Sequence, residues 1–173
     1  SAIIESNSRY SLFIRIIRDY SYMYEPQNFD RLIGTPGFSD ILLKNHFTLY
    51  QGYVTNVNKL SDLLKTVEMG TPQYSELKRH FGWEWNGMRL HELYFENMSK
   101  DAQTTHDTQL TTEIEKQFGS FENWKKDFIA TGAIRGIGWA ILYRDPVSGR
   151  LFNEWVNEHD MGHLAGCTPL LVL

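Results

Sequence analysis

The stretch DILLKNHFTLYQGYVTNVNKLSDLLKTVEM occupies residues 40–69, and QYSELKRHFGWEWNGMRLHELYFENM follows it at residues 73–98. In the first stretch apolar side chains recur three and four positions apart, which is the spacing of one face of an α-helix. Residues 70–72 (GTP) interrupt the pattern, and glycine and proline end helices. Two long helices joined by so short a turn predict an antiparallel α-hairpin.

Three further residues refine this predicted hairpin. Ser39 precedes the first helix and can cap it, because its hydroxyl accepts a hydrogen bond from a free amide of the first turn. Gly82 and Gly87 lie inside the second helix, where glycine costs about 1 kcal/mol relative to alanine. We therefore expect close packing or a kink at these two positions.

The rest of the chain changes its periodicity. Residues 99–109 are polar and predict a loop. Helices are expected at residues 111–116 and 120–132, and strands at 137–143, 151–156 and 168–173, the last strand being buried. The sequence thus predicts an α+β protein, in which a long antiparallel α-hairpin precedes an α/β domain with a small antiparallel sheet.

Composition excludes several classes of protein. With 173 residues, 42% hydrophobic and 22% charged, the chain suits one large or two small globular domains. Its net charge of 17 − 21 = −4 argues against binding to nucleic acid through bulk charge. No apolar run approaches the about 20 residues that a membrane span needs. The single cysteine, Cys167, excludes an internal disulfide framework and a cysteine-rich zinc site.

Two histidines stand out, because each predicted hairpin helix carries one in its interior. If the helices pack together, His46 and His91 can face one point between them, a common way to build a metal site in a helical bundle. Aromatic side chains follow both at helical spacing: Tyr50, Tyr53, Tyr94 and Phe95. This pattern suits a redox metal shielded from water, but spacing alone favours an aromatic core with hydrogen-bonded histidines.

The other four histidines give weaker signals. His80 lies eleven residues before His91, about 16 Å along the helix axis, so it is too far away to share a metal. His106 falls in the polar loop. His159 and His163 precede the last predicted strand, where a loop can bring side chains over a site. Spacing alone favours a solvated loop for these two.

Six short motifs occur in a specific order. They are YEPQNF at residues 24–29, LKNHF at 43–47, YVTN at 53–56, HELYF at 91–95, GIGWA at 136–140 and TPLL at 168–171. Over residues 22–173 this set resembles the iron/manganese superoxide dismutase family. The resemblance implies a helical hairpin domain at residues 22–100 and a C-terminal α/β domain at 101–173, and it leaves residues 1–21 unmatched.

The resemblance also implies a metal site between the two domains. His46 corresponds to the family's first metal ligand and His91 to the second. The remaining two ligands are the Asp and His of an Asp-x-x-Glu-His segment, which follows the Pro-Leu-Leu strand in the family, whereas this sequence ends at Leu173. We therefore expect a truncated C-terminal domain and, for the 173-residue chain alone, poor metal binding and no activity.

Four further positions acquire roles from the resemblance. Tyr53 corresponds to the gateway tyrosine of the substrate funnel, but it follows the first ligand by seven residues rather than the more usual eight, so Tyr50 is a rival. Trp139 matches a tryptophan of the aromatic shell. His159 lies where relatives place a Gln or His that hydrogen-bonds the metal-bound solvent. Gly87 stands where typical iron enzymes carry that Gln.

The implied function is that of an antioxidant oxidoreductase, a superoxide dismutase that converts superoxide to oxygen and hydrogen peroxide. It would use one Fe or Mn ion per subunit once the C-terminal ligands are supplied, and the sequence does not choose between these metals. The alternative is a superoxide-dismutase-like structural or interaction subunit of a larger assembly, with an incomplete and inactive site. An unrelated helical metal-binding or ligand-binding protein is a third reading.

Partners and compartment follow from the same resemblance and from composition. We expect a homodimer or higher homo-oligomer, no nucleic acid and no membrane span. The first 18 residues contain three Arg, four Ser and one acidic residue, a composition that a mitochondrial transit remnant would have. The expected location is the cytoplasm, or the mitochondrion if residues 1–21 are such a remnant.

Overall fold

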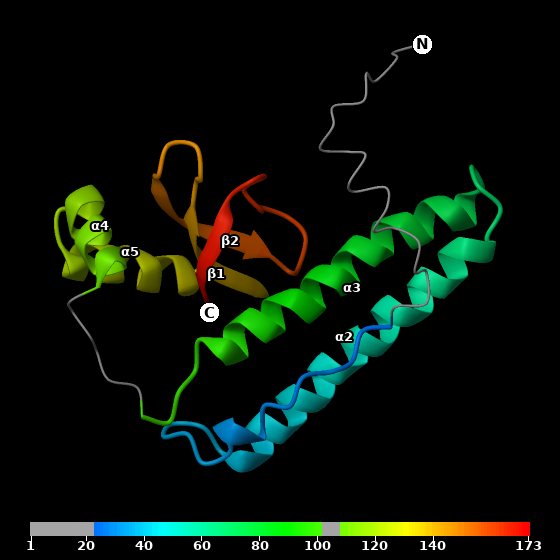
Figure 1. The fold of residues 1–173 in the computed structure, drawn as a ribbon, viewed down its shortest axis with the longest axis horizontal. Helices are drawn as coiled ribbons and strands as arrows, with labels where there is room; N and C mark the ends of the chain where they lie inside the picture. The colour runs from blue at the N-terminus through cyan, green and yellow to red at the C-terminus, as the bar shows by residue number, and fades with distance from the viewer. Residues whose placement is uncertain (1–22, 102–107) are drawn as a thin grey trace, which may run out of the picture.

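The structure is a computed structural model that describes residues 23–101 and 108–173. Its elements are η1 (Asp30–Leu32), α2 (Asp40–Thr66), α3 (Pro72–Glu96), α4 (Gln109–Phe118), α5 (Phe121–Gly132), β1 (Gly138–Arg144), β2 (Leu151–Asn157) and β3 (Thr168–Val172). Figure 1 shows α2 and α3 side by side as an antiparallel hairpin, with the sheet, α4 and α5 on the side of α3. The expectations for residues 1–21 and for His106 fall outside the described residues.

Both hairpin helices begin at a side-chain cap. The Ser39 hydroxyl accepts a hydrogen bond from the backbone amide three residues later at 3.2 Å, as predicted, and the Thr71 hydroxyl does the same at 3.2 Å. Pro72 occupies the first turn of α3, where its missing N–H costs nothing. Both helices end a few residues before the predicted ends. No helix in the described part of the chain is long and apolar enough to cross a membrane.

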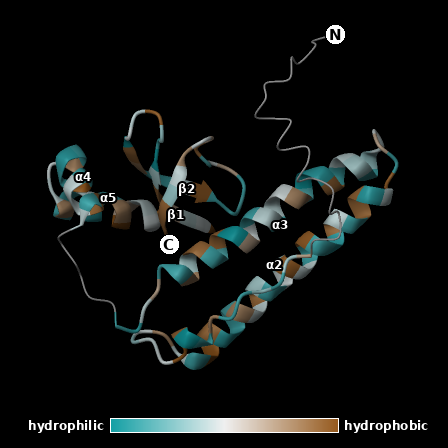
Figure 2. Ribbon diagram, viewed as in Figure 1, coloured by the Kyte–Doolittle hydropathy of each residue, from teal (hydrophilic) through white to brown (hydrophobic). Residues whose placement is uncertain are grey.

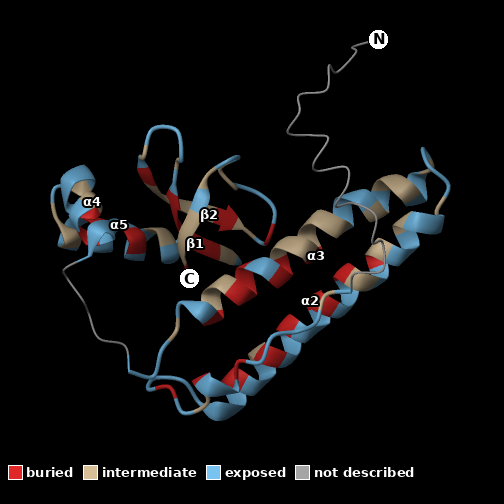
Figure 3. Cartoon of the chain, viewed as in Figure 1, coloured by how far each residue is buried: buried red, intermediate tan, exposed pale blue. Residues whose placement is uncertain are grey.

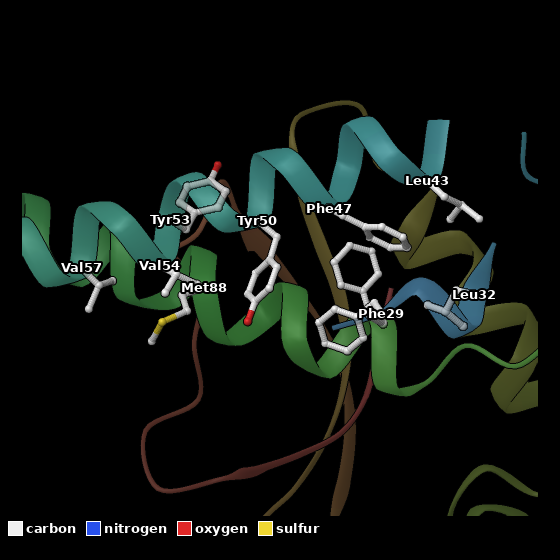
Figure 4. Packing of buried hydrophobic residues seen from close by; sticks show 10 residues of the cluster. Phe29, Leu32, Leu43, Phe47, Tyr50, Tyr53, Val54, Val57 and Met88 are labelled. Carbon is white, nitrogen blue, oxygen red and sulfur yellow. The ribbon is translucent and has the colours of Figure 1, made fainter. Parts of the chain in front are cut away.

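The hairpin interior is largely aromatic. Buried and exposed residues alternate along both helices (Figure 3), and hydrophobic residues recur on them in the same way (Figure 2). Near the start of α2, the Phe29 and Phe47 rings lie side by side (Figure 4). Their centroids are 4.8 Å and 5.1 Å, respectively, from that of the Phe95 ring. Arg31 donates to the carbonyl oxygens of Phe95, in the last turn of α3, and of Met98, just after it, each at 3.0 Å. These contacts fix the segment before α2 against the far helix.

The two glycines inside α3 differ in their surroundings. A Cβ added at Gly87 would lie 2.6 Å from the Tyr53 ring, so the close packing expected there is present. A Cβ added at Gly82 would meet no heavy atom of the described chain within 4 Å. The expectation of close packing at Gly82 is therefore wrong, because that position faces open space.

The C-terminal half forms the expected small antiparallel sheet, in the order β2-β1-β3. Alternate side chains of β1 point to opposite faces. Trp139, Ile141 and Tyr143 pack on one face with Leu90 of α3, whereas Ala140 and Leu142 pack on the other face with α4 and α5. The α+β fold is thus confirmed, and β1 is the strand that faces the hairpin.

The last strand departs from the prediction of a buried strand. β3 pairs with β1 alone, and of its five residues only Val172 is fully buried. It is an edge strand, and an edge strand keeps one side free of backbone partners.

Candidate metal centre

His46 and His91 come together between α2 and α3, as their positions in the sequence suggested. Their ring centroids are 4.9 Å apart and the rings are nearly perpendicular, at 88°. His91 is 3% exposed, whereas His46 is half-buried and lies against the Tyr94 ring at 5.4 Å and the Phe95 ring at 5.0 Å. Two imidazoles from two helices therefore share one aromatic enclosure.

The protonation of His91 suits metal binding. A hydrogen bond of 2.6 Å joins its Nδ1 to the Gly87 carbonyl oxygen. Since a carbonyl only accepts, Nδ1 carries the proton and Nε2 of the neutral ring keeps a free lone pair. Burial, with smaller effects of His46 and His159, lowers the pKa of His91 to about 4, and burial also lowers the pKa of His46. Both rings are thus neutral at neutral pH, the state in which imidazole binds a metal.

His159 lies beside this pair and is buried, at 8% exposure. The solvated loop that spacing favoured is therefore wrong for this residue. Trp139 Nε1–H donates to His159 Nδ1 at 3.0 Å, so the neutral ring carries its proton on Nε2. That N–H then donates to the Tyr53 hydroxyl oxygen at 2.8 Å. Because both ring nitrogens are engaged, His159 is oriented by hydrogen bonds and has no lone pair left for a metal.

The geometry separates the two candidate gateway tyrosines, whose hydroxyls point in opposite directions (Figure 4). The Tyr50 hydroxyl donates to Glu92 at 2.9 Å and accepts from the Gln27 amide at 3.0 Å, so its hydrogen bonding serves the hairpin interior. The Tyr53 ring instead stacks on His91 with centroids 5.1 Å apart. Only Tyr53 of these two reaches His159.

The hydroxyl of Tyr53 keeps its own proton. Burial raises the pKa of Tyr53, and the negative charge of Glu84 raises it further. With His159 donating to its oxygen, the Tyr53 O–H remains free to donate to another acceptor. The line Trp139–His159–Tyr53 is thus a directed chain of hydrogen bonds that ends in an available hydroxyl proton.

Sequence reasoning missed two residues of α3 that border this site. The Trp83 ring lies 4.7 Å from His159, and its indole N–H donates to Glu158 at 3.2 Å. Glu84 is buried and accepts from the Asn56 amide at 3.0 Å. The helical spacing of positions 84, 87 and 91 places Glu84 on the face of His91, a signal that could have found it.

On the sheet side it missed Tyr143, and it named His163 only as a loop residue that could lie over a site or be solvated. Tyr143 of β1 and His163 of the following loop are joined by a hydrogen bond of 2.7 Å. His163 lies four residues after His159, yet the segment is a loop without period, so no pattern predicts this contact.

His46 and His91 have the right chemistry for metal ligands, but the site has few of them. Imidazole is a good ligand for iron, and the two free rings converge. Among residues 23–101 and 108–173 no group of three or more His, Cys, Asp or Glu side chains is placed to hold a metal ion. His46 and His91 therefore fit the role of two ligands in a site that needs further donors.

Comparisons with known proteins identify the family. Residues 105–173 match the family model described as iron/manganese superoxide dismutases, C-terminal domain. The chain is 38% identical over 144 residues to a superoxide dismutase (Fe) of Cupriavidus metallidurans, covering 79% of this chain and 71% of that protein. It is 34% identical over 160 residues to superoxide dismutase (Mn) 1 of Haloferax volcanii, covering 90% and 78%. The chain belongs to the iron/manganese superoxide dismutase family, as its sequence motifs indicated.

Proposed function

We propose that this chain is a superoxide dismutase subunit, which converts two superoxide ions and two protons to oxygen and hydrogen peroxide with a single iron or manganese ion. The observation that carries the proposal is the meeting of two neutral imidazoles, His46 and His91, beside the chain Trp139–His159–Tyr53. The names of the relatives, which include iron and manganese enzymes, support the same reaction and leave the choice of metal open.

The bound metal would supply the one-electron oxidation of one superoxide ion and the one-electron reduction of the next. The chain's own residues supply binding and protons. His46 and His91 would hold the ion through their neutral rings. Tyr53 holds a proton on its hydroxyl. His159 Nε2–H donates to the Tyr53 oxygen, so the hydroxyl proton stays directed toward another acceptor. Formation of peroxide consumes protons, so a protonated hydroxyl at this place is a suitable donor.

The alternative proposal is a superoxide-dismutase-like subunit that serves as a structural or interaction part of a larger assembly. One observation favours it, since among the described residues no third His, Cys, Asp or Glu side chain is placed to hold a metal together with His46 and His91. Two imidazoles alone hold a redox metal weakly. Under this alternative the aromatic enclosure is a folded core without catalytic use.

Metal loading and dismutation, measured together, test the two proposals. The chain, extended after Leu173 by a segment with the family's Asp-x-x-Glu-His pattern, is loaded with Fe or Mn, and metal per chain and superoxide disproportionation are compared with those of the same protein carrying His91→Gln. Lys116→Gln is the control variant, because Lys116 lies on the exposed face of α4 and forms its ion pair with Glu113 of the same helix. The enzyme proposal expects loss of metal and activity in His91→Gln only. A folded protein that takes up neither metal would contradict it and support the alternative.

A further inference from the structure

A second histidine–tyrosine pair lies next to the proposed site. Tyr143 of β1 is 4% exposed, and its hydroxyl oxygen lies 2.7 Å from His163 Nδ1. The other ring nitrogen of His163, Nε2, lies 2.8 Å from the backbone carbonyl oxygen of His159. This pair is therefore hydrogen-bonded to the backbone of His159, whose ring already accepts a hydrogen bond from the Trp139 indole.

The direction of each hydrogen bond follows from the chemistry of the groups. A carbonyl oxygen only accepts, so His163 Nε2 must carry a proton. The neutral ring then has a lone pair on Nδ1, and the Tyr143 hydroxyl donates to it. Burial raises the pKa of Tyr143 to about 12, which keeps that hydroxyl protonated. The direction is Tyr143 to His163 to the His159 carbonyl.

Both anchors start from one face of one strand. Trp139 and Tyr143 are four residues apart on β1, so their side chains share a face, and both pack with Ile141 against α3. Trp139 fixes the ring of His159, and Tyr143, through His163, fixes its backbone. Two attachments to ring and carbonyl restrict the rotations that set where His159 Nε2–H points.

The loop between the strands has a shape that depends on such attachment. Glu158 has a positive φ of 52°, which a non-glycine residue seldom adopts. Gly162 has a φ of 112°, and a Cβ there would lie 2.5 Å from the Trp155 carbonyl oxygen. A backbone hydrogen bond of 2.7 Å from Asn157 to Met161 closes the turn. His163 follows directly, and its Nε2–H donates to the His159 carbonyl oxygen in the middle of this turn.

We infer that His163 and Tyr143 are positioning residues, which hold the backbone of His159 so that its ring stays between the Trp139 indole and the Tyr53 hydroxyl. Their relevance to catalysis rests on the proposed dismutase function. Their effect on His159 does not, because it can be observed in the metal-free protein.

The test uses nuclear magnetic resonance of the full chain without metal. The Trp139 indole proton and the ring nitrogens of His159 report the hydrogen bond between them. His163→Leu removes both the donor and the acceptor of the linking ring. We expect the Trp139 indole signal to move upfield and its exchange with water to become about five to ten times faster, as the loss of one hydrogen bond predicts.

His163→Gln is the matched variant, because its amide offers both an N–H donor and an oxygen acceptor in a similar place. We expect it to restore most of the wild-type signals. Tyr143→Phe, which removes one hydroxyl from the same link, should shift the signals in the direction of His163→Leu. It also serves as the second variant should His163→Leu fail to fold.

Ile114→Ala controls for general loss of stability, because Ile114 is buried in the cluster on the opposite face of the sheet. The inference is overturned if Trp139 and His159 keep their wild-type signals in both His163→Leu and Tyr143→Phe, or if Ile114→Ala shifts them equally. If the signals shift as expected while the chain extended after Leu173 by the family's Asp-x-x-Glu-His pattern shows no dismutation when loaded with metal, the positioning stands and the proposed function fails.

Discussion

Glu84 is a single residue whose charge reaches the proposed gateway hydroxyl. Its carboxylate is buried, and its Oε2 has no hydrogen-bond partner among the described residues. Since this charge raises the pKa of Tyr53, Glu84→Gln should lower that pKa, although burial, the larger cause, should keep it above the ordinary value of 10. Titration of the Tyr53 ring carbon signal by nuclear magnetic resonance measures the change.

Glu92→Gln is the matched control for this prediction. Glu92 raises the pKa of Tyr50, through a hydrogen bond and its charge, and it is not among the causes that raise the pKa of Tyr53. It should therefore lower the pKa of Tyr50 and leave Tyr53 unchanged. An unchanged Tyr53 pKa in Glu84→Gln would contradict the role assigned to Glu84.

His91 makes the stability of the metal-free protein depend on pH. Its pKa falls from an ordinary 6.5 to about 4 in the folded chain, so below pH 6.5 the unfolded chain binds a proton that the folded chain refuses. The free energy of unfolding should thus fall as the pH drops from 6.5 to 4, by on the order of 3 kcal/mol from this group. Burial of His46 and His159 acts in the same direction.

Urea denaturation at several pH values measures this effect. His91→Gln removes the titrating ring, so its stability should fall less steeply over the same interval. Equal slopes for wild type and His91→Gln would show that another group causes the loss.

At the scale of elements, α3 packs closely against α2 at Gly87, whereas a side chain at Gly82 would meet open space. Gly87→Ala would force its new Cβ against the Tyr53 ring at 2.6 Å, so the ring must move. We expect a loss of about 1–3 kcal/mol in the free energy of unfolding, the usual cost of overpacking, and a weaker contact between Tyr53 and His159. Gly82→Ala meets open space and should stabilise α3 by up to about 1 kcal/mol.

Thermal and urea unfolding measure whether Gly87→Ala lowers and Gly82→Ala raises the free energy of unfolding. Because both substitutions are glycine to alanine within the same helix, differences in helix propensity cancel between them. A Gly87→Ala protein as stable as Gly82→Ala would mean that Tyr53 can yield without cost.

The elements also show how far sequence reasoning reaches. The hairpin, its Ser39 cap and the convergence of His46 with His91 follow from helical periodicity, which is local along the chain. The burial of His159 does not follow, because residues 157–163 have no period. That loop takes its shape from hydrogen bonds to a strand about 20 residues earlier in the chain. Such contacts between distant segments are set by tertiary packing.

At the scale of the whole molecule, the proposed site draws on both halves of the chain. The hairpin provides the two free imidazoles and the Tyr53 hydroxyl, whereas the sheet side provides His159, whose two nitrogens are already engaged. Tight binding of a redox metal thus requires donors beyond those of the described residues. The number of ligands limits metal binding, since the rings of His46 and His91 are already neutral and converge.

This count of donors predicts the behaviour of the 173-residue chain taken alone. After loading with Fe or Mn it should retain well below one ion per chain and show little dismutation, as measured by elemental analysis and a superoxide assay. Joining a segment with the family's Asp-x-x-Glu-His pattern after Leu173 should raise both, and the same fusion carrying His91→Gln should not. Near-stoichiometric metal and full activity in the unextended chain would refute the prediction, because two imidazoles would then suffice.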